Sequence, residues 1–313
     1  MKLGVGLPGY LGNAIDAQTV LDWARVADEA GFHAVAAHDR PDSDAWDPLA
    51  TLAVAAPVTQ RVRLATTVVL LPTRDEALVA KQASVIDQVS GGRLDFGVGL
   101  GGRAEDYEVF GRPFRARGRR LEEQLARMLA IWSAAAEGGQ ENAGLGPASF
   151  QRPHPRLWIG GYTNASIERA VSIGDGYTFG APGIAVIENR LPAVRAAAAA
   201  AGRTDFPVGA LAYVALTTNP SQLRDGERML THYYGTLRKP FLEMVHTGEA
   251  DDVRAAIDAY RRAGVDVLYL FPVIPTMRQL ELWSEELLPH VSGEPVSGEP
   301  VSGKPNAPAA TSA

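Results

Sequence analysis

Short apolar runs alternate with longer amphipathic stretches along most of this chain, and this alternation limits its possible folds more than any other feature. Eight runs are typical of β-strands, and each is followed by apolar residues at helical spacing. Such alternation predicts a parallel sheet with right-handed crossovers. The predicted strands are residues 3–7, 34–38, 62–71, 94–100, 157–160, 177–179, 208–216 and 265–272. The predicted helices are residues 16–30, 47–59, 75–89, 117–136, 164–173, 192–201, 221–237, 251–263 and 277–288.

The number of strand–helix units predicts fold class α/β with a single (β/α)8 TIM barrel over residues 1–290. No change of composition marks a boundary between two domains. Residues 101–116 and 137–156 exceed the usual length of connections, so we expect loop insertions at the C-terminal face of the barrel. The segment 291–313 begins with the repeats VSGEP, VSGEP and VSGKP, and this composition predicts a disordered C-terminal tail.

Composition excludes several classes of protein. The chain has no cysteine, which excludes disulfides, zinc–thiolate sites and cysteine nucleophiles. A net charge of −6 with interspersed signs argues against a nucleic-acid surface. No apolar run reaches the roughly 18 residues of a membrane helix, and the amino terminus reads as a strand rather than a signal peptide. We therefore expect a cytoplasmic protein without nucleic-acid or membrane partners.

Residues at the ends of the predicted strands favour binding of a cofactor over hydrolytic chemistry. Glycine and small polar residues dominate these ends, where barrel enzymes place their active sites. The most polar end is His38-Asp39-Arg40, although a lone histidine is more often structural and Asp39 and Arg40 also suit a loop ion pair. The histidines lack H-x-x-x-H and H-E-x-x-H spacing, so no metal site is expected. No serine lies in a G-x-S-x-G context.

The stretch Gly97–Gly102 matches the dinucleotide fingerprint G-x-G-x-x-G. In a Rossmann fold this motif opens directly into a helix of the first βαβ unit. Here it ends the fourth strand, and Gly111, Pro113 and Gly118 delay the next helix until about Arg117. We interpret the match as accidental, although glycines at a strand end, including Gly99 and Gly101, would let a flat cofactor approach the backbone.

The motif Gly160-Gly161-Tyr162-Thr163 leaves the fifth strand and precedes a helix that Thr163 or Asn164 can cap. Free N–H groups and the helix dipole make such a terminus a natural phosphate seat. An ordinary strand–helix turn would also favour glycine and threonine, so the motif alone leaves both interpretations open.

The ordered pattern resembles the luciferase-like monooxygenase family, whose members use FMN or the deazaflavin F420 on a (β/α)8 barrel. The matching stretches, in family order, are ADEAGFHAVAAHDR, DPLATLAVAAPVTQRVRLATTVVLLPTRDEALVAKQASVIDQVSGGRLDFGVGLGG, EDYEVFG and LWIGGYTNASIERAVSIGDGY. The resemblance implies a third-strand bulge at Thr66-Thr67-Val68-Val69, with a cis peptide at Thr67–Val68 supporting the cofactor ring. It also implies that Gly160–Thr163 binds the cofactor phosphate.

Three positions depart from the family pattern. F420-dependent members often have a glutamate where this chain has Gly102, and the nearest acids, Glu105 and Asp106, lie in the following loop. Those members commonly have Asp-His where this chain has His38-Asp39. Luciferase-type members carry an arginine for the FMN phosphate where this chain has Leu100, with Arg103 as a substitute. The cofactor choice stays open, and the compact length favours F420.

We therefore predict an oxidoreductase that uses reduced F420 or FMN on a small organic substrate, by hydride transfer or monooxygenation. His38 and Asp39 are the candidates for proton transfer. Alternatives are a non-catalytic flavin-binding relative and a non-redox phosphate-binding barrel enzyme. Similar proteins are usually homodimers, here through helices 47–59 and 74–90, and a reductase is a candidate partner that supplies reduced cofactor.

Overall fold

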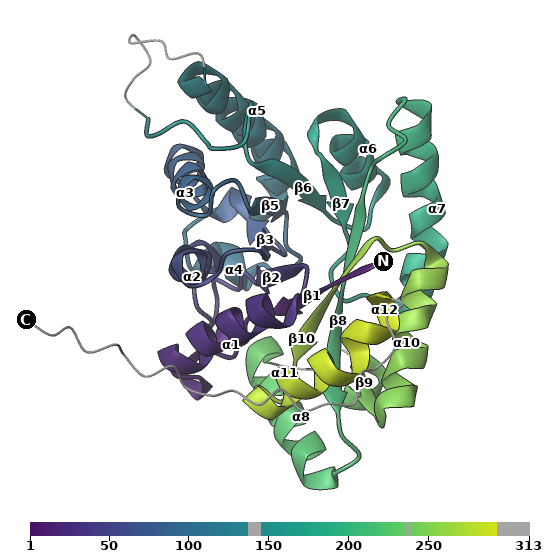
Figure 1. Ribbon diagram of the computed structural model, residues 1–313. Coiled ribbons are helices and arrows are strands. Elements are labelled where there is room, and N and C mark those ends of the chain that lie inside the picture. Colours follow the sequence, from purple (N-terminus) through teal and green to yellow (C-terminus); the bar gives the residue numbers. More distant parts are fainter. Residues whose placement is uncertain (137–144, 236, 238, 293–313) are drawn as a thin grey trace, which may run out of the picture.

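The computed structural model describes residues 1–136, 145–235, 237 and 239–292, and its chain forms a closed parallel barrel surrounded by helices (Figure 1). Strand β1 pairs with β2 and β10, and β8 pairs with β7 and β10, which closes the ring. The expected (β/α)8 barrel is therefore confirmed. The strands are β1 Lys2–Gly6, β2 Ala34–Ala37, β3 Arg63–Thr66, β4 Val69–Leu70, β5 Leu94–Gly99, β6 Arg156–Gly160, β7 Gly176–Thr178, β8 Val208–Leu216, β9 Val245–Gly248 and β10 Val267–Pro272.

Helices cover the outside of the barrel, with α1, α2, α3 and α5 on the left of Figure 1 and α6, α7 and α10 on the right. Side-chain caps begin several of them, including Asp16 at α1, Asp47 at α2 and Asp75 at α3. The helices are α1 Ala17–Ala30, α2 Pro48–Ala55, α3 Glu76–Val89, α4 Glu105–Glu108, α5 Arg117–Ala136, α6 Asn164–Ile173, α7 Ile184–Ala200, α8 Pro220–Tyr234, α9 Phe241–Met244, α10 Ala250–Ala263, α11 Met277–Leu282 and α12 Leu288–Ser292.

Two layers of buried side chains follow from the alternation of the strands. In β2, Val35 and Ala37 belong to the large cluster that also contains Trp23 and Trp283. Ala34 and Ala36 belong to a second cluster, which includes the aromatic side chains of β8 and β10. Because successive residues of a strand face opposite sides, the two clusters fill the barrel interior and the space beneath the helices.

The third predicted strand, residues 62–71, is divided into β3 and β4. The peptide bond between Thr67 and Val68 is cis, as the resemblance implies. Strand β5 pairs with β3 through Leu94 and Asp95 and with β4 through Val98 and Gly99. The two short strands together therefore occupy one position in the ring.

The bounds of α7 and α12 differ from the prediction. Helix α7 begins at Ile184 and not at Pro192, which lies inside it. Ile187, Leu191 and Val194 are buried on one face, and burial of this face outweighs the hydrogen bond that proline cannot donate. Helix α12 continues to Ser292, so the first two residues of the predicted tail are helical. The rest of that tail, residues 293–313, lies outside the described residues, as do residues 137–144 of the predicted loop.

The segment between β8 and β10 contains an insertion that the sequence pattern does not reveal. Strand β9 pairs with the carboxyl end of β8, from Tyr213 opposite Val245 to Leu216 opposite Gly248. Helix α8, predicted as 221–237, ends at Tyr234, and the short helix α9 follows. The return to β10 is made by α10. The insertion brings the end of α8 to the face of the barrel where the strands finish.

Candidate active site

A cavity of about 400 Å³ lies at the carboxyl ends of the strands. Predicted site residues that line it are His38, Asp39, Thr67, Val68, Gly99, Leu100, Gly101, Gly160, Gly161, Tyr162 and Thr163. Thr66 lies outside this lining, because its hydroxyl donates to the Gly97 carbonyl at 2.7 Å and accepts from the Gly97 N–H at 2.7 Å. The structure thus brings together all the predicted residues except Thr66, whose hydroxyl joins β3 to β5.

One side of the cavity, here called the glycine wall, consists of Thr67–Val68, Gly99–Gly102 and Gly160–Thr163. Its glycines leave room for the bulged strand. A Cβ on Gly99 would lie 2.7 Å from Val68 Cγ2, and a Cβ on Gly160 would lie 2.9 Å from Val68 Cγ1. A Cβ on Gly97, just beneath, would lie 2.1 Å from the Thr66 carbonyl oxygen. Gly97 and Gly99, the first two glycines of the Gly97–Gly102 stretch, are therefore required by contacts inside the barrel.

The glycine wall ends at the first turn of α6. Thr163 caps this helix, with its hydroxyl accepting from the Ser166 N–H at 3.2 Å, while Ser166 Oγ accepts from the Thr163 N–H at 3.0 Å. Ser166 Oγ also lies 3.0 Å from the Tyr177 hydroxyl, which fixes the turn against β7. The N–H groups of Asn164 and Ala165, the first two residues of α6, have no acceptor within the helix, as in any first turn. This arrangement provides polarised donors at the cavity edge, where an anion would be stabilised.

His38 connects the glycine wall to the opposite side. Its Nδ1 lies 2.9 Å from the Thr67 carbonyl oxygen, so Nδ1 is the donor and Nε2 keeps its lone pair. The Nε2 atom is buried and has no hydrogen-bond partner among the described residues. Phe271 stacks on the imidazole, with ring centroids 3.9 Å apart. Burial lowers the pKa of His38 to about 4, so the ring is neutral near pH 7 and can accept a proton or a hydrogen bond.

Asp39 holds the bulged strand in place. Its carboxylate accepts from the Leu70 N–H at 2.8 Å and forms an ion pair with Arg74, with Nη2 2.8 Å from Oδ1. Arg74 also pairs with Asp47 at the start of α2. Burial raises the pKa of Asp39, and the Arg74 charge opposes that shift. Both carboxylate oxygens are engaged, so the geometry suits a positioning residue.

The opposite side, here called the aromatic wall, consists of Tyr213, Tyr233 and Tyr234 with Arg40 and Arg103. The Tyr213 and Tyr234 hydroxyls lie 2.8 Å apart. Burial raises the pKa of Tyr213 and Tyr233 well above its usual value, so these phenols stay protonated. The Arg40 guanidinium lies 5.1 Å from the centroid of the Tyr233 ring. This side is therefore built from side chains, in contrast to the glycine wall.

Most residues of the aromatic wall were missed by sequence reasoning. Tyr233 and Tyr234 reach the cavity from the end of α8, and the only signal for them is the adjacent pair of tyrosines before Gly235. Asp106, expected only in the loop after the fourth strand, lines the cavity with Arg103. Its carboxylate accepts from the Asp42 N–H at 3.2 Å, and burial raises its pKa.

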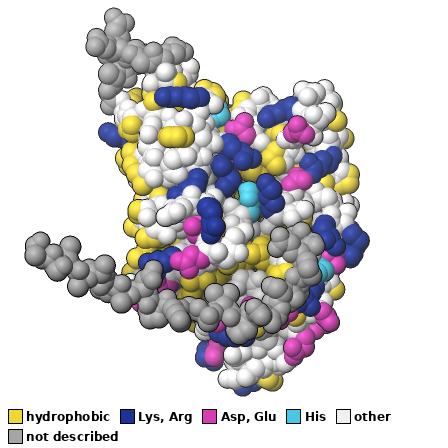
Figure 2. Space-filling model, viewed as in Figure 1, with side chains coloured by type: hydrophobic (Ala, Val, Ile, Leu, Met, Phe, Trp, Pro, Cys, Tyr) yellow, Lys and Arg dark blue, Asp and Glu magenta, His cyan; other side chains and the backbone are white. Residues whose placement is uncertain are grey.

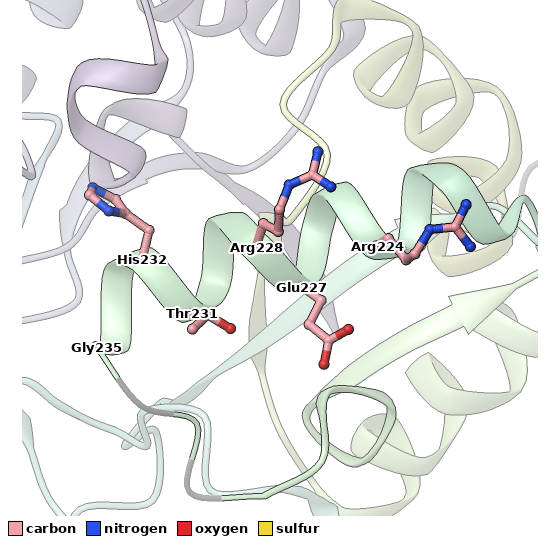
Figure 3. Close-up of a pocket in the computed structure, with 6 residues that line it drawn as sticks. All are labelled: Arg224, Glu227, Arg228, Thr231, His232 and Gly235. Atoms are coloured by element: carbon pink, nitrogen blue, oxygen red, sulfur yellow. The ribbon is translucent and has the colours of Figure 1, made fainter.

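A second hollow lies on α8 and is lined by Arg224, Glu227, Arg228, Thr231, His232 and Gly235 (Figure 3). Arg228 and Glu227 point to opposite sides of the helix in that view. His232 turns away toward Asp44, with Nε2 2.9 Å from Oδ1. Because these side chains do not converge on one point, the hollow offers no catalytic constellation comparable to the barrel cavity.

The described residues contain neither a metal-binding cluster nor a membrane-spanning helix. No group of three or more His, Asp or Glu side chains that could hold a metal ion occurs among the residues that the structure describes. Within the same residues, no helix combines the length and apolar character needed to cross a membrane.

Comparisons with known proteins agree with the fold. A Mycobacterium tuberculosis protein, provisionally named as a coenzyme F420-dependent oxidoreductase, is 29% identical over 286 residues, which cover 84% of this chain and 78% of that protein. The oxygenase component of a flavin-dependent trigonelline monooxygenase from Acinetobacter baylyi is 29% identical over 165 residues, or 50% of this chain and 46% of that protein. The crystal structure of the monooxygenase RslO1 from Streptomyces bottropensis superposes with a TM-score of 0.79 at 27% identity, covering 93% of this chain and 100% of that one.

These relatives include both F420-dependent and flavin-dependent proteins. The family model described as luciferase-like monooxygenase matches residues 1–267, which span the barrel from β1 into the first residue of β10. This chain belongs to the luciferase-like monooxygenase family.

Proposed function

We propose that the chain is an oxidoreductase that binds reduced FMN or F420 in the barrel cavity and uses it to transform a small organic substrate. The observation that carries this proposal is the joint position of Val68 and the first turn of α6 on one wall of one cavity. A flat ring can lie against the Thr67–Val68 segment while its phosphate reaches the N–H groups near Thr163. His38, whose buried Nε2 has no hydrogen-bond partner among the described residues, lines the same cavity.

When bound, such a cofactor supplies the redox chemistry, and the protein binds, orients and excludes water. The glycine wall would hold the ring and the phosphate. His38 would accept a hydrogen bond or a proton at Nε2, because its Nδ1 is committed to the Thr67 carbonyl. Asp39 would act indirectly, since it fixes Leu70 and thereby the bulge. The proposed reaction is either hydride transfer to the substrate or its monooxygenation.

Titration of the full-length protein with FMN and with F420, followed by absorbance, tests the proposal. We expect at least one of them to bind at micromolar concentration. The Gly161→Val variant should bind it at least tenfold more weakly, because a Cβ there would lie 2.4 Å from Ser166 Cβ. Gly118→Ala in α5 is the matched control, since nothing lies within 4 Å of its added Cβ. If the folded wild-type protein binds neither cofactor, the proposal is wrong.

The proposed assembly is a homodimer through α2 and α3. Exposed apolar side chains gather on these helices, with Leu78 and Val89 each 56% exposed, Val54 46% and Val85 41%. Figure 2 shows hydrophobic side chains along the left edge of the molecule, where α2 and α3 lie in Figure 1. Burying such a patch favours association. Sedimentation should give a dimer for the wild type and a monomer for Leu78→Glu, and a wild-type monomer would contradict the assembly. A reductase that supplies reduced cofactor is a further proposed partner.

A further inference from the structure

Arg40 is a buried cation whose guanidinium forms no direct ion pair with any described residue. Its residue is only 6% exposed, and it lines the cavity. No carboxylate lies within 4 Å of its guanidinium in the described part of the chain. Its Nη2 donates to the Tyr234 carbonyl at 3.3 Å, while Nε is buried and has no hydrogen-bond partner. A buried charge is costly unless it is paired, so this position requires an explanation.

A second guanidinium lies beside it. Arg103 Nη1 donates to the same Tyr234 carbonyl at 3.0 Å, which places two like charges around one oxygen. The Arg103 charge is balanced, since Asp42 lies at 3.5 Å and Asp106 at 3.9 Å. The carboxylate next to Arg40 in the chain, Asp39, is committed to Arg74 at 2.8 Å. The Arg40 charge also opposes the rise in the pKa of Asp106, so Arg40 differs from Arg103 in having no carboxylate within 4 Å of its guanidinium among the described residues.

The surroundings of Arg40 suit a planar ligand. The guanidinium lies 5.1 Å from the centroid of the Tyr233 ring and 5.8 Å from that of Tyr234. A cation this close to aromatic faces is attracted to them, and of its N–H groups Nη2 is engaged by the Tyr234 carbonyl while Nε has no partner among the described residues. The Tyr213 ring and the Tyr234 hydroxyl continue the surface into the cavity. Aromatic rings with protonated hydroxyls bind aromatic ligands through stacking and hydrogen bonds.

We propose that the aromatic wall binds a small aromatic substrate through an anionic group, a carboxylate or an acidic phenolate, that pairs with Arg40. This inference rests on the proposed function, because it names the substrate of the same site. The phosphate seat at α6 follows β6, whereas Arg40 follows β2, and β3 and β5 lie between these strands in the ring. The cavity thus has two separate anion seats, one for the cofactor phosphate and one for the substrate.

Binding of 2-naphthoate and of its neutral amide, 2-naphthamide, to the full-length protein tests the proposal by calorimetry. We expect the wild type to bind the carboxylate at least tenfold more tightly than the amide, because a charge-assisted contact to a buried guanidinium adds to the stacking. Arg40→Met should lose this preference and keep its affinity for the amide. Arg40→Lys should keep part of it, because lysine retains the charge without the planar fork. The matched control is Arg119→Met, whose arginine side chain is 80% exposed and lies outside the cavity.

Equal affinities in the wild type, or an unchanged preference in Arg40→Met, would overturn the proposal. If Arg40→Met unfolds, Arg40→Lys provides the test. Its preference for 2-naphthoate over 2-naphthamide must be at least threefold smaller than that of the wild type. Titration of the same variants with FMN and riboflavin shows whether Arg40 binds the anionic group of the substrate or the phosphate of the cofactor. A tenfold weaker binding of FMN alone to Arg40→Met would assign Arg40 to the cofactor phosphate and overturn the proposal. Failure of the wild type to bind either FMN or F420 would instead refute the proposed function. The preference for 2-naphthoate over 2-naphthamide would still test the role of Arg40 in that case.

Discussion

The two walls of the cavity are built in different ways. The glycine wall exposes mainly backbone, and two of its glycines, Gly99 and Gly160, are fixed by contacts with Val68 of the bulged strand. The aromatic wall is made of side chains, and two of its tyrosines come from α8, which belongs to an insertion between β8 and β10. A change in the glycine wall must therefore disturb the barrel, whereas the aromatic wall can change with the insertion alone. We propose that the first wall holds the cofactor and that the second selects the substrate.

The largest expected effect comes from adding a side chain at Gly97, just beneath the glycine wall. Gly97→Ala places a Cβ 2.1 Å from the Thr66 carbonyl oxygen, and this backbone cannot move without separating β3 from β5. We expect the free energy of unfolding to fall by about 3 kcal/mol or more, measured by denaturant titration. Gly102→Ala is the control, because nothing lies within 4 Å of its added Cβ. Equal stability of the two variants would remove the argument that this wall is fixed by the barrel.

The next effect concerns His38, which joins the two walls. The folded-state pKa of about 4 lies below the unfolded value near 6.5, so the unfolded chain takes up the proton first as the pH falls. The contribution of neutral His38 to the free energy of unfolding is therefore complete above about pH 6.5, and it is lost as the pH falls toward 4. Between pH 7 and pH 5 the wild type should lose about 2 kcal/mol more than His38→Phe.

The variant comparison is needed because His33 also has a pKa lowered to about 4, chiefly by burial. Both proteins share that contribution, and it cancels in the difference between their unfolding free energies. Parallel stability curves for the wild type and His38→Phe would contradict the assignment of His38 as a buried neutral group.

The barrel and the glycine wall could be predicted from the sequence because both depend on local patterns. Alternating apolar runs identify the eight strands of the ring, and the spacing of glycines marks where strands end. The extra strand β9 was missed because three of its four residues are only half-buried, so its sequence shows no apolar alternation. The start of α7 was missed because Pro192 suggests a helix beginning when read alone.

The aromatic wall could not be predicted, since its residues are far apart in the chain. Arg40 and Tyr234 meet only because α8 folds over the strand ends. A buried arginine without a carboxylate has no sequence signature, because its isolation depends on Asp39 binding Arg74 instead. The resemblance to a family implied a cofactor side at Thr67–Val68 and Gly160–Thr163 and left the substrate side open.

A smaller effect separates the helix cap from the cofactor contact. Thr163→Ala removes the hydroxyl that accepts from the Ser166 N–H, and this should reduce the free energy of unfolding by about 1 kcal/mol. Thr276→Ala removes the corresponding cap of α11, outside the cavity lining, and should lower stability to a similar extent. Only Thr163→Ala should also reduce the preference for FMN over riboflavin. An equal preference in both variants would show that the α6 terminus does not contact a phosphate.

The smallest expected effect is that of Tyr213→Phe, which removes one hydroxyl from the aromatic wall. The Tyr234 hydroxyl loses a partner at 2.8 Å, but it lines the cavity, where water can replace that partner. The loss of stability should therefore be about 0.5 kcal/mol, at the low end for a hydrogen bond. Binding of 2-naphthoate and 2-naphthamide should weaken about threefold for both, because the hydroxyl orders the wall without contributing charge. FMN binding should stay unchanged. A stronger effect on FMN than on the two naphthalene probes would mean that the walls are not functionally separate, because the ring would then lie against the tyrosines as well as against Val68.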